Sequence, residues 1–190
     1  MPAVPRLARR AAAGILGGMP VFPLARCTVR PWVAADAASL VRHADDRAVW
    51  RNLRDGFPHP YTAADAEVWL TWVLPQDPVT HFAIEVEGEA AGGIGFTIGQ
   101  DVQRRTAEIG YWLGRAHWGR GIVTEALRAV TEHAFATHNL VRIEARVFAW
   151  NTGSVRVLEK AGYALEGRLR RAVEKDGQTT DMLVYAALRR

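Results

Sequence analysis

The chain has 190 residues, of which 49% are hydrophobic and 23% charged, with a formal net charge of +4 at pH 7. These values are ordinary for one soluble globular domain with a full core. The single Cys27 excludes an intramolecular disulfide and suits a reducing, cytoplasmic compartment. The histidines lack metal-ligand spacing, and no run approaches the ~20 apolar residues of a membrane span, so neither a metal nor a membrane is expected. The arginines are scattered, which argues against a nucleic-acid partner.

Residues 1–24 form an expected leader, followed by a single domain at residues 25–190. The leader carries arginines and a short apolar stretch broken by glycines, without a clear small-x-small cleavage site. It therefore resembles a secretory signal only superficially. We expect a disordered leader, or a start codon placed too early.

The hydrophobic pattern of the domain predicts a mixed α/β fold with a largely antiparallel sheet. Strands are expected at residues 26–32, 81–87, 90–98, 107–113, 140–148, 163–173 and 180–188. Helices are expected at residues 36–46 and from Thr62, Ile122 and Asn151 onward. Thr62 fits an N-cap with Asp65 in the first turn. Residues 47–60 contain glycine and prolines and predict a turn-rich loop.

A strand–loop–helix unit at residues 107–136 is the most informative stretch. Its loop reads Trp118-Gly-Arg-Gly-Ile-Val123. Two glycines let a ligand approach the backbone closely, and the N–H groups at a helix start attract anions, so the loop predicts a phosphate site. It lacks the lysine of a Walker loop and the third glycine of a dinucleotide site. On its own the loop is equally compatible with an ordinary turn from strand to helix.

A second run follows, Asn151-Thr-Gly-Ser-Val-Arg-Val-Leu-Glu-Lys-Ala-Gly-Tyr163. In this order and spacing, the two runs resemble the GNAT superfamily of acetyl-CoA-dependent N-acetyltransferases. The segment GYWLGRAHWGRGIVTEAL is most similar to the RimJ/RimL branch, and the resemblance covers residues 27–188. It implies the GNAT fold, with a sheet that splays between its fourth and fifth strands where acetyl-CoA enters. We expect a monomer or a homodimer.

The resemblance places acetyl-CoA, the one co-substrate expected, against two backbone segments. N–H groups near the end of the fourth strand would meet the thioester carbonyl beside a bulge, and those of residues 119–124 would hold the pyrophosphate. The expected cofactor-binding residues are Trp112, Leu113, Trp118, Gly119, Arg120, Gly121, Ile122, Val123, Thr124, Asn151 and Ser154. Val123 departs from the usual Gly or Ala and crowds the pyrophosphate, but the backbone donors remain. Arg120 either adds charge to the site or is simply solvated.

Two residues are expected to take part in catalysis, Glu108 and Ser154. Glu108 is the candidate general base because it lies on the central strand near the thioester, with a structural carboxylate as the alternative. Glu144 is the rival base, although a cross-strand ion pair with an arginine is favoured for it. Ser154 either protonates or solvates the departing thiolate, or is only a small residue beside the cofactor. Asn151 binds a pantetheine amide, caps its helix, or does both, and Leu158 replaces the tyrosine acid of many family members.

The acceptor is expected to bind within residues 47–80. Phe57, His59 and Tyr61 lie in a proline-rich loop there and form the expected substrate wall. The predicted reaction is direct attack of a primary amine on acetyl-CoA in a ternary complex. The amine is a protein N-terminus, or a small amine, amino acid or antibiotic. The alternative is a non-catalytic acyl-CoA-binding or regulatory module, which Val123 and the missing tyrosine mildly support.

Overall fold

The computed structural model describes residues 14–16 and 19–189. Within these residues nine strands form one sheet in the order β1-β2-β3-β4-β5-β6-β7-β9-β8. The strands are β1 (Gly14–Leu16), β2 (Met19–Pro23), β3 (Thr28–Pro31), β4 (His81–Val86), β5 (Glu89–Ile98), β6 (Thr106–Leu113), β7 (Arg142–Phe148), β8 (Ala164–Lys175) and β9 (Gln178–Leu188). The α-helices are α1 (Ala37–Ala44), α2 (Arg47–Trp50), α3 (Ala63–Val73), α4 (Ile122–Thr137) and α5 (Thr152–Ala161). Short 3-10 turns lie at Ala34–Asp36, Asp101–Gln103 and Arg115–His117.

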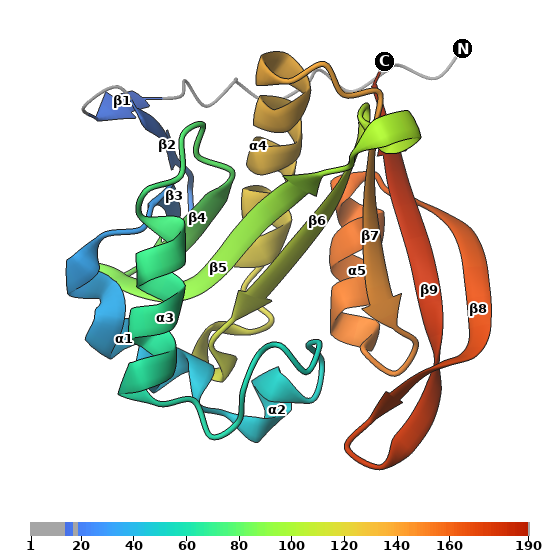
Figure 1. Cartoon of the computed structure of the whole chain (residues 1–190), viewed down its shortest axis with the longest axis horizontal. Helices are drawn as coiled ribbons and strands as arrows, with labels where there is room; N and C mark the ends of the chain where they lie inside the picture. Colours follow the sequence, from blue (N-terminus) through green and yellow to red (C-terminus); the bar gives the residue numbers. More distant parts are fainter. Residues whose placement is uncertain (1–13, 17–18, 190) are drawn as a thin grey trace.

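The helices cover the two faces of the sheet unequally (Figure 1). Alternation along β4 separates two apolar clusters: Ala83 joins the cluster under α1 and α3, whereas Phe82 and Ile84 join the cluster under α4 and α5. The buried members of the first cluster lie over β3–β5, and Trp112 of β6 packs against its margin. On that face, no helix of the described residues covers β6, β7 and β9, and this open part of the sheet is where the candidate site lies.

The sheet opens between β6 and β7, its one parallel pair among the described strands. Their register runs from Thr106–Arg142 to Glu108–Glu144 and then stops. Beyond that point β6 remains paired with β5, and β7 remains paired with β9. These two strands are the fourth and fifth of those predicted from residue 26 onward. The predicted mixed fold, with a largely antiparallel and splayed sheet, is therefore confirmed.

Local signals in the sequence set the boundaries of several elements. Thr62 Oγ1 accepts a hydrogen bond from the N–H of Asp65 at 3.3 Å, and the Asp65 carboxylate accepts one from the N–H of Thr62 at 2.8 Å. This reciprocal capping box begins α3, with Thr62 as the predicted N-cap. Asp176 and Gly177 have φ values of 54° and 68°, as a type I′ hairpin turn requires, and they join β8 to β9.

The structure differs from the expected disordered leader over Met19–Pro23, which form β2. This strand pairs with β3 through Phe22 and Val29. Phe22 is 6% exposed, and its ring makes edge contacts with Phe82 and His133 at 5.8 and 5.1 Å. One buried aromatic ring thus anchors a strand that is too short to show a period. Residues 1–13 and 17–18 of the leader lie outside the described residues.

In the described ranges, no helix has both the length and the apolar character needed to cross a bilayer.

Candidate functional site

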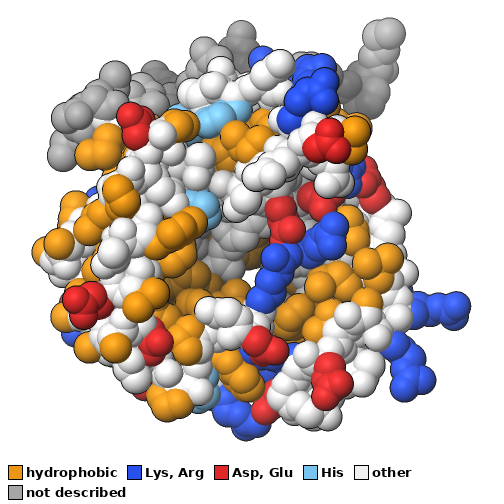
Figure 2. Space-filling view, viewed as in Figure 1, with side chains coloured by type: hydrophobic (Ala, Val, Ile, Leu, Met, Phe, Trp, Pro, Cys, Tyr) orange, Lys and Arg blue, Asp and Glu red, His pale blue; other side chains and the backbone are white. Residues whose placement is uncertain are grey.

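A cavity of about 1470 Å³ runs through the gap between β6 and β7. Its walls come from both strands, the first turns of α4 and α5, and the loop after α2. Figure 2 shows the open face hollowed near its centre, with acidic and basic side chains gathered beside the hollow. The cavity therefore joins the predicted phosphate loop to the open face of the sheet.

The phosphate loop has the backbone that its glycines predict. Gly119 and Gly121 have φ values of 75° and 77°. A Cβ atom would meet nothing within 4 Å at Gly119, and only the Arg26 side chain, 3.7 Å away, at Gly121. Glycine is therefore required here by the left-handed conformation and not by crowding.

The start of α4 offers free hydrogen-bond donors to the cavity. The first helical bond runs from the N–H of Glu125 to the carbonyl of Gly121 at 3.3 Å. The N–H groups of residues 122–124 consequently have no partner inside the helix and lie at the positive end of its dipole. Val123 lines the cavity and also packs against the apolar core. These residues fit a bound pyrophosphate.

Two side chains of the loop serve its structure. Trp118 donates from Nε1 to the carbonyl of Leu113 at 2.7 Å, which ties the loop to the end of β6. Arg120 contacts Glu87 at 3.1 Å and His117 at 3.2 Å. Arg120 does not line the cavity, so the added charge considered for it is not supported.

Trp112 and Leu113 line the cavity at the end of β6. The expected bulge is not found on the β5 side of this strand, because the register with β5 is continuous from Gly92–Leu113 to Ile98–Ala107. The strand instead loses its β7 partner beyond Glu108. The divergence of β6 and β7 alone thus makes room for an extended ligand.

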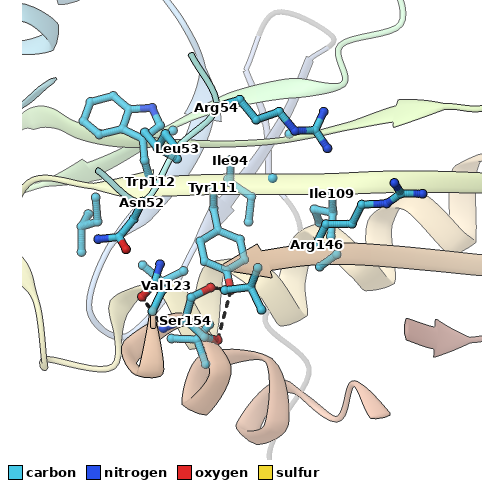
Figure 3. A pocket seen from close by; sticks show the side chains of 18 of the residues that line it. Asn52, Leu53, Arg54, Ile94, Ile109, Tyr111, Trp112, Val123, Arg146 and Ser154 are labelled. Atoms are coloured by element: carbon cyan, nitrogen blue, oxygen red, sulfur yellow. Dashed lines mark hydrogen bonds between the residues drawn. The ribbon is translucent and has the colours of Figure 1, made fainter. Parts of the chain in front are cut away.

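Tyr111 and Ser154 meet across the gap between β6 and α5 (Figure 3). Their hydroxyl oxygens are 2.7 Å apart. Burial raises the pKa of Tyr111 far above its usual range, so the phenol stays neutral and able to donate. Tyr111 was not predicted as a site residue. The strand alternation was the available signal, because it places Tyr111 on the opposite face from Glu108, toward α5. Leu158, 1% exposed, belongs to the core.

Asn151 caps α5, as one of its two interpretations predicted. Its Oδ1 accepts a hydrogen bond from the N–H of Ser154 at 3.1 Å. The side chain also lines the cavity, so its amide NH₂ group is available to a ligand.

Glu108 and Glu144 lie side by side on the open face, in register on β6 and β7. Glu144 accepts hydrogen bonds from Arg142 and Arg146, with N–O distances of 3.2 and 3.1 Å. The ion pair expected for Glu144 is therefore present, but its arginine partners lie on the same strand and not across strands as predicted. Among the residues that the structure describes, Arg54 is the one cationic partner of Glu108, to which it donates from the loop after α2. Both carboxylates line the cavity.

Two of the three residues expected to form the acceptor wall line the cavity. Phe57, Tyr61 and Trp112 form an aromatic group that lines the cavity, with the Phe57 ring 5.0 Å from Tyr61 and 5.5 Å from Trp112. The structure does not bring His59 to the cavity. Its Nδ1 lies 3.3 Å from Asp45 Oδ1, so this histidine ties the loop before α3 to the residue after α1.

Sequence reasoning missed other lining residues. Asn52, Leu53 and Arg54 approach the cavity from the loop after α2, while Arg146 approaches from β7 (Figure 3). His81 also lines the cavity, and burial lowers the pKa of its imidazole to about 4. Because aromatic residues dominated the interpretation of the loop after α2, Arg54 was overlooked there.

Comparisons with known proteins agree with this geometry. The acetyltransferase (GNAT) domain family matches residues 26–164. The uncharacterized N-acetyltransferase p20 of Bacillus licheniformis is 32% identical over 168 residues, 87% of this chain and 94% of that protein. The ribosomal-protein-serine acetyltransferase of Escherichia coli is 35% identical over 107 residues, 56% of this chain and 59% of that protein. The structure of Mycobacterium smegmatis RimJ in complex with CoA-disulfide gives a TM-score of 0.75 at 30% identity, covering 85% and 81% of the two chains.

The splayed sheet and the helix-start loop define the class, which is that of the acyltransferases. The chain belongs to the GNAT acetyltransferase family. Its likeness to RimJ and to the ribosomal-protein-serine acetyltransferase confirms the predicted RimJ/RimL-like branch.

Proposed function

We propose that this protein transfers the acetyl group of acetyl-CoA to a primary amine by direct attack in a ternary complex. The observation that carries the proposal is one continuous cavity that joins the start of α4 to Glu108 and to the Tyr111–Ser154 pair. The related RimJ of Mycobacterium smegmatis was solved in complex with CoA-disulfide, which supports the choice of co-substrate.

The backbone of the loop and of α4 would hold the co-substrate. N–H groups of residues 122–124 suit the pyrophosphate, and the Asn151 amide suits a pantetheine amide. N–H groups near Trp112 and Leu113 are proposed for the thioester carbonyl. When bound, acetyl-CoA supplies an activated acyl group and a thiolate leaving group.

Glu108 is the proposed general base. In the free protein its carboxylate is paired with Arg54, which has to leave before an amine can reach it. The Arg54 side chain is 66% exposed and can turn into solvent. An incoming ammonium group would replace it at Glu108 and lose a proton there, directly or through one water.

Ser154 and Tyr111 are proposed to act on the leaving side. Their hydrogen-bonded hydroxyls can deliver a proton, or a hydrogen bond, to a developing thiolate. This pair replaces the tyrosine acid that Leu158 cannot provide. The neutral state of Tyr111, which follows from its raised pKa, keeps the donor available.

The acceptor is proposed to be a protein N-terminus or a small amine. The Escherichia coli relative is a ribosomal-protein-serine acetyltransferase, which supports a protein acceptor. The Glu108 carboxylate lines the cavity, and its pairing with an exposed arginine suits exchange for an ammonium group. We propose a cytoplasmic site of action, consistent with the buried free thiol of Cys27.

A screen of amine acceptors, with mass-spectrometric detection of an added acetyl group, tests the proposal. The panel includes peptides with free N-termini, the same peptides blocked at the N-terminus, and small amines. Acetylation of free but not blocked peptides, or of a small amine, is the expected result. The Arg54–Glu108 pair favours the alternative, a non-catalytic acyl-CoA-binding module. Coenzyme A binding without turnover on any acceptor would decide for that alternative.

A further inference from the structure

The turn of the β8–β9 hairpin contacts the segment that leads into the cavity wall. We call this segment, residues 47–57, the acceptor loop, a role that rests on the function proposed above. Arg47 donates to Asp176 at 2.7 and 3.0 Å, and Arg51 donates to Gln178 at 2.7 Å. Both arginine side chains are exposed, 68% and 42%, so these surface contacts contribute little alone.

Lys175 makes the buried contact of this junction. It is one of two lysines in the chain, and its side chain is 2% exposed. Its Nζ lies 2.7 Å from Asp55 Oδ1 and 3.8 Å from the ring centroid of Trp50. A buried ammonium group requires such partners, and the face of an indole ring attracts a cation. Lys175 is therefore enclosed by the acceptor loop.

The contact between Lys175 and Asp55 lies one residue away from the candidate site. Asp55 follows Arg54, which donates to Glu108. Between the end of α2 and the start of α3 the chain forms turns without a helix or strand, so its position depends on contacts of this kind. Lys175, in contrast, ends a long strand next to a type I′ turn and is a fixed anchor.

We infer that Lys175 is a positioning residue for the acceptor site. Held between Asp55 and Trp50, it fastens the acceptor loop to the β8–β9 turn and sets where Arg54 stands relative to Glu108. Lys175 does not line the cavity, so it acts through the loop and touches neither reacting group.

Lys175→Met and Lys175→Arg test this inference, with Arg170→Met as the matched control. Arg170 is an exposed cation of the same strand with no ion pair among the described residues. We expect Lys175→Met to lower kcat/KM for the acceptor by about 10–10²-fold, since a small misplacement of the site has effects of this size. The affinity for coenzyme A should not change. Hydrogen exchange should accelerate at the amides of residues 47–57, and Lys175→Arg should restore most of both properties.

The outcomes separate the inference from the proposed function. Wild-type kcat/KM and exchange in Lys175→Met, or equal effects in Arg170→Met, would overturn the positioning role. If Lys175→Met does not fold, Asp55→Asn takes its place, because the Asp55 side chain is 82% exposed and its replacement should leave the core intact. Faster exchange in residues 47–57 of a protein that acetylates no amine would reject the proposed function and support the Lys175 contact.

Discussion

Strand β6 directs its two proposed proton-handling groups to opposite faces of the sheet. Glu108 faces the open side with Arg54, whereas Tyr111 faces α5 and contacts Ser154. An odd spacing of three residues on a strand with a period of two has this result. The amine can thus lose its proton on one face while the thiolate receives one on the other.

Tyr111→Phe removes one hydroxyl and keeps the ring. We expect turnover to fall about 10²-fold, the lower range for loss of a general acid, with coenzyme A affinity nearly unchanged. Ser154→Ala should have a similar effect, and the double variant should be little worse, because the two hydroxyls act as a unit. Tyr163→Phe is the control, since Tyr163 bonds to Thr131 away from the cavity. Wild-type turnover in both single variants would exclude the pair from the reaction.

His81 should make the fold sensitive to acid. Burial lowers its pKa from 6.5 to about 4, so between these values the unfolded chain binds a proton that the folded chain does not. The free energy of unfolding therefore falls as the pH drops through this window. Urea unfolding above pH 6.5 and near pH 4 measures this loss. Between these two pH values the free energy of unfolding should fall less in His81→Gln than in the wild type. An equal loss in both proteins would contradict this assignment.

At the scale of an element, the helix start of α4 is proposed to bind the pyrophosphate. Placing a side chain on a residue in the left-handed conformation costs about 1–2 kcal/mol. The loop either relaxes away from the binding conformation or keeps it under strain, and relaxation weakens ligand binding. Gly121→Ala should therefore weaken coenzyme A binding by about tenfold, as titration calorimetry can measure. Gly167→Ala is the control, because a Cβ atom there meets nothing within 4 Å and its φ is not positive. A folded Gly121→Ala protein with wild-type affinity would remove this loop from the site.

At the scale of the whole molecule, local patterns in the sequence predicted most elements. The features that were not predicted depend on contacts between residues far apart in the sequence. The alternation of β4–β6, the N-cap at Thr62 and the turn at Asp176-Gly177 depend on neighbouring residues, and each was predicted. The splay between β6 and β7 followed from the family resemblance. The short strand β2 offered no period to read.

The site was predicted less completely for the same reason. Its important contacts join residues 43, 54 and 120 positions apart: Tyr111 with Ser154, Arg54 with Glu108, and Lys175 with Asp55. No local pattern encodes such pairs. The glycine loop was predicted because its chemistry depends on the backbone of consecutive residues. His59 was misplaced because an aromatic residue in a loop fits a ligand wall and a loop anchor equally well.

The pH dependence of turnover in Glu108→Gln tests the central claim, acetyl transfer to an amine activated at Glu108. This change keeps the shape and removes the base. With the preferred acceptor from the screen, turnover at neutral pH should fall ~10²–10⁴-fold at near-normal coenzyme A affinity. The remaining activity should rise toward high pH, where the amine deprotonates unaided. Glu144→Gln serves as the control and should keep the wild-type pH profile. Wild-type turnover and pH dependence in Glu108→Gln would contradict the account.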